Sequence, residues 1–156
     1  MAHSNRLAKS PPFFYFERAL YQTEIAHASI PFISQGVHKE RLVEIDVRTQ
    51  DQVKIIKLRG KLNLGASLDR TNETLKDLLD AGESRFLLDL QEVPMIDSSG
   101  IGLLVRYLTA TKQKGGSLKL LNPSKFALQT LKLVRVLNLF EVFEDQPAAV
   151  ASFQTA

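Results

Sequence analysis

Residues 94–105, with the sequence PMIDSSGIGLLV, place a turn rich in hydroxyl groups between an apolar strand and an amphipathic helix. Residues 85–90 (RFLLDL) are typical of a strand buried on both faces, and the apolar residues after the turn recur with helical spacing. Ser98 or Ser99 is therefore a natural N-cap. Because the first turn of a helix has unpaired N–H groups and partial positive charge, an anion there is stabilised, and a phosphoserine would fit.

The same residues also have a purely structural explanation. Ser and Asp ahead of an apolar helix are ordinary capping residues, worth about 1 kcal/mol. Gly100 and Gly102 could allow a helix to pack closely on a sheet. They could equally allow a kinase active site to approach a neighbouring hydroxyl group. A carboxylate at Asp97 gains only about 0.3–1 kcal/mol from the helix dipole, so we expect Asp97 to matter more for recognition than for stability.

A resemblance to a known family favours the functional interpretation. Residues 97–102 (DSSGIG) resemble the Asp-Ser-Ser/Thr-Gly-Leu-Gly signature of anti-sigma factor antagonists, the small proteins built on the STAS domain. Residues 53–63 are similar to the family's second strand followed by Gly-x-Leu-Asp, and residues 115–120 to its Gly-Gly turn into a strand. The chain departs from the pattern at Asn63, where the family usually has Asp in a loop facing the partner kinase. This departure bears on partner affinity rather than on the fold.

Composition excludes several classes of protein. A chain of 156 residues suits one domain with an appendage, and the absence of cysteine excludes disulfides, thiolate metal sites and thiol catalysis. The net charge is +3, but twenty basic residues are dispersed among seventeen acidic ones, so we expect no nucleic-acid partner. The apolar runs are far shorter than the roughly 20 residues of a spanning helix. We expect a soluble, cytoplasmic protein without a membrane span.

The first forty residues differ in character from the rest. Prolines and a glycine interrupt them, and the aromatic cluster at residues 13–16 has no clear period. We interpret residues 1–40 as an N-terminal extension, either disordered or a misassigned translation start, with a short helix over about residues 14–28 as an alternative. Residues 41–156 form the predicted STAS domain, which we expect to fold without the extension.

The strands follow a simple order from residue 41. An edge strand carrying Leu42, Val43, Ile45 and Val47 pairs with residues 53–58 across a polar turn at residues 49–52. Further strands are expected at residues 86–90, at residues 118–121 and briefly near residues 140–143. Alternation of strands and helices after an opening hairpin predicts an α/β domain. Its mixed sheet should have about five strands, with helices packed mainly on one side, in agreement with the STAS fold.

Four helices are expected between these strands. Ser67 or Asp69 can cap the first, which ends near residues 81–82, and the helix after the serine turn runs to about residue 114. Ser124 can cap the third, whose inward residues would be Ala127, Leu128, Leu131 and Val134. Pro147 suits the first turn of a closing helix.

We expect no catalytic residue, metal or cofactor. A serine at a strand-to-helix turn also describes the nucleophile elbow of hydrolases, but Ile96 stands where the elbow needs a glycine. All three histidines lie in the first forty residues, so the predicted domain contains no imidazole base. Neither metal-ligand spacing nor a phosphate-binding glycine loop is present. The chain is therefore expected to be a substrate of phosphoryl transfer rather than an enzyme.

The resemblance implies a specific role. An anti-sigma factor antagonist binds an anti-sigma factor with GHKL-type serine-kinase activity and so frees a sigma factor for transcription. The family's phosphorylated residue, the first hydroxyl after the Asp, maps onto Ser98, and a PP2C-type phosphatase would reverse the modification. The expected partner-binding residues are Asn63, Asp97, Ser98, Ser99, Gly100 and Ile101. The alternative is a STAS docking module of a transporter complex or another signalling assembly.

Overall fold

A computed structural model describes residues 41–155 of the chain. The predicted extension, with its alternative helix over residues 14–28, lies outside the described residues. The boundary at residue 41 therefore stays a prediction.

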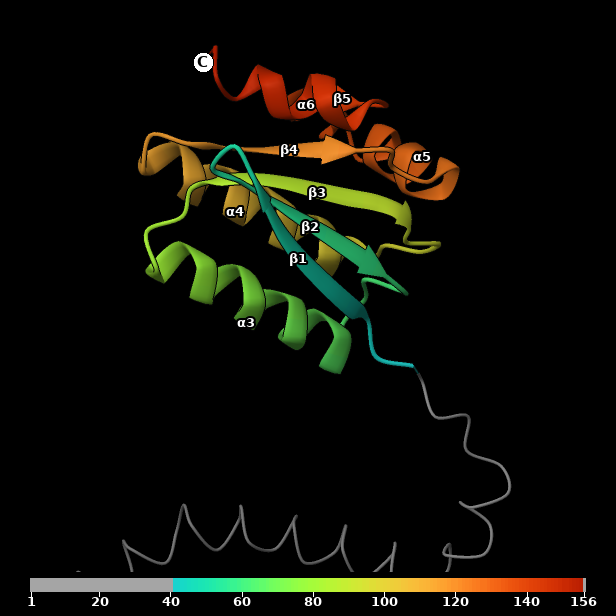
Figure 1. The fold of residues 1–156 in the computed structure, drawn as a ribbon. Helices are drawn as coiled ribbons and strands as arrows, with labels where there is room; N and C mark the ends of the chain where they lie inside the picture. Colours follow the sequence, from blue (N-terminus) through green and yellow to red (C-terminus); the bar gives the residue numbers. More distant parts are fainter. Residues whose placement is uncertain (1–40, 156) are drawn as a thin grey trace, which may run out of the picture. The chain divides into compact units, whose positions relative to one another are not determined.

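A five-stranded mixed sheet forms the centre of the described domain (Figure 1). The strands are β1 (Glu44–Gln50), β2 (Val53–Arg59), β3 (Arg85–Glu92), β4 (Ser117–Leu121) and β5 (Val142–Phe143), and their order in the sheet is the order in the chain. β1 pairs with β2 antiparallel, and every later pair is parallel. This confirms the predicted mixed sheet of five strands opened by an antiparallel hairpin.

The opening hairpin turns more tightly than the sequence suggested. Gln50 already pairs with Val53, which leaves only Asp51 and Gln52 in the turn. Both have positive φ, 50° and 66°, as the two central residues of a type I′ turn require. The predicted turn at residues 49–52 was too long because Thr49 and Gln50 are polar yet remain in the strand.

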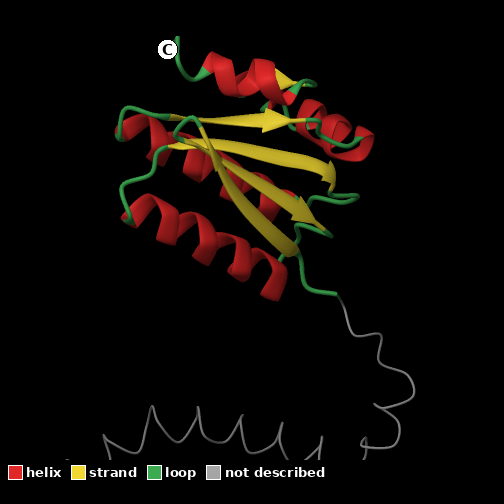
Figure 2. Ribbon diagram, viewed as in Figure 1, coloured by secondary structure: helices red, strands yellow, loops and turns green. Residues whose placement is uncertain are grey.

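Helices cover both faces of the sheet (Figure 2). α3 (Ala66–Asp80), α4 (Ser98–Gln113) and α5 (Lys125–Leu133) contribute to a large apolar cluster that takes Phe86, Leu88 and Leu90 from β3. α6 (Gln146–Ser152) covers a smaller cluster with Leu87 on the opposite side of that strand. β3 is thus buried on both faces, as its continuous apolar run predicted. Most of the helices lie on one side, also as predicted.

The helix ends show which capping predictions are right. Ser124 accepts a hydrogen bond from the Ala127 N–H and caps α5, and Pro147 lies in the first turn of α6. α3 begins after Gly65 without a side-chain cap, so the prediction of Ser67 or Asp69 as its cap is wrong. The Ser67 hydroxyl instead accepts the Val43 N–H at 3.1 Å. Val134, predicted to face inward, lies beyond the last residue of α5 and is exposed.

The loops after β2, β3 and β4 lie at the C-terminal ends of these strands, and this end of the sheet positions the candidate site. β2, β3 and β4 are parallel, so the loops that follow them lie at the same end. The Ser124 hydroxyl donates to the Val93 carbonyl at 2.6 Å and joins the loop after β4 to the loop after β3. The short 3-10 helix η1 (Leu137–Leu139) follows α5 and leads into β5.

Candidate functional site

Asp97 caps helix α4. Its backbone is extended, with φ −101° and ψ −176°, and its Oδ1 accepts the Gly100 N–H at 2.9 Å. Ser98 is therefore the first helical residue, and the prediction that Ser98 or Ser99 caps the helix is wrong. The physical reason is that a carboxylate one position earlier already satisfies the unpaired N–H group. The serine hydroxyls are consequently not needed for capping.

The other oxygen of Asp97 holds a second segment. Its Oδ2 accepts the Leu64 N–H at 2.9 Å, across 33 residues of sequence. The two segments also pair through their backbones, since Leu62 N–H donates to the Met95 carbonyl at 2.9 Å and Asp97 N–H to the Leu62 carbonyl at 3.3 Å. The loop after β2 is thereby fixed beside the serine turn.

The two glycines of the motif differ in their surroundings. A Cβ on Gly100 would collide with the Leu62 carbonyl oxygen and would come within 2.8 Å of the Ile96 Cγ1 atom. Gly102 faces open space, with no atom near the position of an added Cβ. Close packing therefore explains Gly100, where the helix touches the loop after β2, and does not explain Gly102.

The surroundings of Asp97 favour its ionised form. Burial would raise the pKa of the carboxyl group, but hydrogen bonds from the backbone N–H groups of Leu64, Gly100 and Ser99 outweigh this effect. The pKa of Asp97 is consequently held below its ordinary value. A negative charge therefore sits at the N-terminus of α4, directly beside Ser98, across the pH range of a cell.

The predicted site residues divide into a presented and a supporting group. Ser98 is exposed, and Asn63, Asp97 and Ser99 are half-buried. Gly100 is buried, and Ile101, only 7% exposed, belongs to the large apolar cluster. The domain therefore covers most of these two residues, and their assignment as partner-binding residues stays a prediction.

Two exposed apolar residues beside the serine turn escaped the sequence analysis. Leu64 is 73% exposed in the loop held by Asp97, and Met95 is exposed just before the motif. Together with Ser98 they form the serine-turn surface, defined here as Asn63, Leu64, Met95, Ser98 and Ser99.

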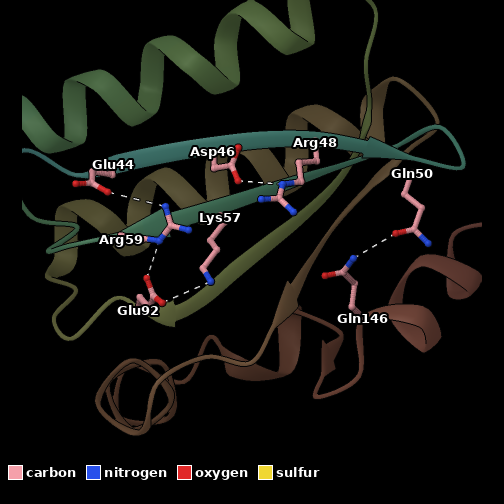
Figure 3. A network of polar contacts seen from close by, with 8 residues as sticks. All are labelled: Glu44, Asp46, Arg48, Gln50, Lys57, Arg59, Glu92 and Gln146. Atoms are coloured by element: carbon pink, nitrogen blue, oxygen red, sulfur yellow. Dashed lines mark hydrogen bonds and ion pairs between the residues drawn. The ribbon is translucent and has the colours of Figure 1, made fainter.

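A second polar cluster lies on the face of β1 and β2 (Figure 3). Glu92 pairs with Arg59 at 2.8 Å and with Lys57 at 3.5 Å, and Arg48 pairs with Asp46 at 3.0 Å. A hollow of about 160 Å³ lies among these side chains. Because each of its cations already contacts a carboxylate, we interpret this cluster as an ion-pair network of the sheet surface.

Neither a metal site nor a membrane span is found among residues 41–155. No three His, Cys, Asp or Glu side chains in this part of the chain gather as metal ligands. No helix within it combines the length and the apolar character needed to cross a membrane.

Comparison with known proteins assigns this geometry to a family. Residues 44–149, more than half of the chain, match the family described as the STAS domain. The chain belongs to the STAS domain family. A curated relative from Bordetella bronchiseptica, BtrV, is named as a candidate anti-sigma factor antagonist. It is 28% identical over 106 residues, which are 68% of this chain and 90% of that protein.

Solved structures share the STAS fold of this chain. The anti-sigma factor antagonist SpoIIAA, in its unphosphorylated form, has a TM-score of 0.63 at 16% identity, covering 72% of this chain and 98% of that one. A sulfate transporter family protein from Wolinella succinogenes has a TM-score of 0.56 at 22% identity, covering 69% and 89% respectively. At these identities the likeness shows the fold alone, so the predicted STAS fold is confirmed.

Proposed function

We propose that this STAS domain protein is an anti-sigma factor antagonist that phosphorylation of Ser98 switches off. The observation that carries the proposal is the exposed Ser98 hydroxyl at the first position of α4, left unused by the cap because Asp97 supplies it. The name of the relative BtrV supports the same role. The role places the protein in the cytoplasm, where ATP is available to a kinase.

In the unmodified state, the serine-turn surface binds an anti-sigma factor of the GHKL kinase type. Leu64 and Met95 supply apolar contact area around Ser98, and Asn63 supplies a neutral amide where the family usually has a carboxylate. The bound anti-sigma factor releases its sigma factor. The Ser98 hydroxyl then lies at the surface where the kinase can reach it.

Phosphorylation changes the charge of this surface without removing a structural hydrogen bond. A phosphoryl group on Ser98 adds about −1.5 to −2 charges beside the Asp97 carboxylate. The helix N-terminus tolerates part of this charge, and the cap stays with Asp97, so the domain remains folded. The partner contact fails because a compact neutral hydroxyl becomes a bulky dianion. A PP2C-type phosphatase restores the binding form.

The direct test is phosphorylation by a GHKL-type kinase encoded in the same genome. After incubation of the full chain with this kinase and ATP, mass spectrometry should find one phosphate, on Ser98. Ser99→Ala is the matched control and should accept phosphate normally. Ser98→Ala should accept none and bind the kinase persistently, whereas Ser98→Asp should bind it weakly. Phosphate on Ser99 would move the acceptor site, and phosphate on neither residue would refute the switch.

Asn63 favours a second candidate function, a STAS docking module of a transporter complex or other signalling assembly. Asn63 lacks the charge that antagonists usually place in this loop, and a sulfate transporter family protein shares the fold. In that case the serine-turn surface would bind its partner without modification. The kinase assay separates the two functions. A docking module gains no phosphate, and its Ser98→Ala variant binds the partner as well as the wild type does.

A further inference from the structure

The end of α5 and the following η1 expose apolar side chains that the described domain does not cover. Leu133 is 82% exposed, Val134 48% and Leu139 47%. Phe126, also exposed, lies seven residues before Leu133 and therefore on the same helical face, two turns earlier. We call Phe126, Leu133, Val134 and Leu139 the α5 surface. Such a cluster of exposed apolar residues marks an interaction site more often than a structural need.

A groove adjoins this surface where α5 meets η1. It has a volume of about 370 Å³ and is lined by Lys132, Arg135, Leu137 and Asn138, with mostly apolar walls. The aliphatic stems of the two cations can supply such walls while their charged ends remain in water. The groove can therefore accept an apolar side chain and place cations at its rim.

The cations around the α5 surface have no carboxylate partner within residues 41–155. Lys125, Lys132 and Arg135 are in none of the described ion pairs. Lys125 and Lys132 are seven residues apart, so they form a basic row along α5 beside the row of Phe126 and Leu133.

Arg135 occupies a backbone position that is unfavourable for any residue with a side chain. Its φ is 61°, and the bonds Val136 N–H to Leu131 carbonyl and Arg135 N–H to Lys132 carbonyl end α5 as a Schellman motif. Glycine is the usual residue at this position, because a side chain destabilises the left-handed conformation. The helix dipole accounts for a cation here but not for the exposed leucines around it.

From these observations we propose that the α5 surface docks an acidic amphipathic helix of a partner protein. Apolar side chains of that helix would contact Leu133, Val134 and Leu139, and its carboxylates would contact Lys132 and Arg135. An apolar row with an adjoining groove is the arrangement that helix-in-groove recognition uses, and the unpaired cations select acidic sequences. The proposal is independent of phosphorylation, since it uses no residue of the serine-turn surface.

The test uses a fluorescent 15-residue peptide with Leu at helical spacing and Glu elsewhere, and a counterpart with Lys in place of Glu. Fluorescence anisotropy with the full chain should show saturable binding of the acidic peptide and at least tenfold weaker binding of the basic one. Binding should weaken as salt rises from low to physiological concentration. Leu133→Ser should reduce affinity at least tenfold, and Lys132→Glu should reverse the preference between the peptides.

Two further variants separate docking from stability. Arg135→Gly should melt at or above the temperature of the wild type while binding the acidic peptide several-fold more weakly. Leu42→Ser, at an exposed apolar residue outside the α5 surface, should bind as the wild type does. Equal affinity for the two peptides, or unchanged binding by Leu133→Ser, would overturn the proposal. The proposal would also fail if the protein bound neither peptide and sedimented as a dimer that Leu133→Ser dissociates. The surface would then bind a second copy of the chain.

Discussion

Asp97 accepts backbone hydrogen bonds on both of its carboxylate oxygens, and each bond holds a different segment. Oδ1 fixes the first turn of α4 and Oδ2 fixes the loop after β2. The helix dipole alone suggested a small contribution to stability. With two charge-assisted hydrogen bonds, the expected contribution is larger.

Asp97→Asn should lower the free energy of unfolding by about 1–2 kcal/mol at pH 7, because the amide keeps one acceptor but replaces the other with a donor. The pKa of Asp97 is lowered in the folded state, so its contribution is complete above the unfolded pKa, about 3.9, and is lost as pH falls through the lower folded value. Urea denaturation at pH 7, 5 and 3 should show a constant gap between the two proteins down to pH 5 and a smaller gap at pH 3. A gap independent of pH would contradict this role.

The glycines of the motif allow a matched pair of substitutions. Gly100→Ala should destabilise the domain by about 1–3 kcal/mol, since its Cβ meets a backbone carbonyl that cannot move without opening the loop. Gly102→Ala should stabilise it by about 0.5–1 kcal/mol, because the position is helical and open. Thermal unfolding of the two variants measures both effects. Equal changes in the two proteins would mean that the contact with Leu62 has little energetic weight.

The sequence predicted a candidate site around residues 97–101 but not which residue caps the helix there. Asp and Ser have similar capping preferences, so the sequence alone did not identify the residue that caps α4. The burial of Ile101 follows from its place as the first residue of the apolar row of the helix. The exposure of Leu64 depends on the tether from Asp97, a contact across 33 residues that local patterns do not contain.

Among the elements, α3 and α4 are joined by part-buried polar contacts of Tyr107 with Asn72. The Tyr107 hydroxyl lies 2.8 Å from Asn72 Oδ1 and 3.0 Å from the Asn72 carbonyl oxygen. Burial raises the pKa of Tyr107, so the hydroxyl keeps its proton and can donate at every physiological pH. The contact fixes the position of α4 relative to α3, and α4 carries Ser98.

Tyr107→Phe should lower the free energy of unfolding by about 0.5–1.5 kcal/mol, the net value of a typical intramolecular hydrogen bond. Asn72→Ala removes the Oδ1 acceptor of Tyr107 and of Arg106 but leaves the Asn72 carbonyl as an acceptor. The double variant should cost less than the sum of the single changes, because both remove the contact between the Tyr107 hydroxyl and Asn72 Oδ1. Chemical denaturation of the four proteins measures this coupling. Strict additivity would show that the two side chains contribute separately.

Predictions of elements were accurate where apolar periodicity was strong. The apolar patterns correctly predicted β3 and most of α4. The glycine at position 82 correctly predicted the end of α3, and Gly82 has a φ of 94°. The predictions were wrong mainly at the ends of strands and helices. β1 and β2 extend to a two-residue turn because backbone pairing, rather than side-chain polarity, sets the limit of a hairpin. α5 ends at Leu133 because Arg135 takes the left-handed conformation, which leaves Val134 outside the core.

For the whole domain, the sheet separates two apolar clusters that depend on different helices. The larger cluster includes α3, α4 and α5, and the smaller one is closed by α6 and Phe153. Lys119 crosses from β4 to this second layer, where its Nζ lies 2.8 Å from Ser152 Oγ, 2.7 Å from a Glu141 oxygen and 4.5 Å from the centre of the Phe153 ring. The C-terminal helix is thus part of the fold rather than an appendage.

Together the two clusters take their buried apolar side chains from the interval between Val43 and Phe153. Deletion of residues 1–36 should therefore leave a single cooperative unfolding transition and the circular dichroism of an α/β domain. Phosphorylation of Ser98 by the kinase should proceed as in the full chain, because hydrogen bonds of Leu62, Leu64 and Asp97, all retained in the truncated protein, hold the serine turn. A truncated protein without a cooperative transition would show that the first forty residues complete the fold, and the domain boundary would have to move.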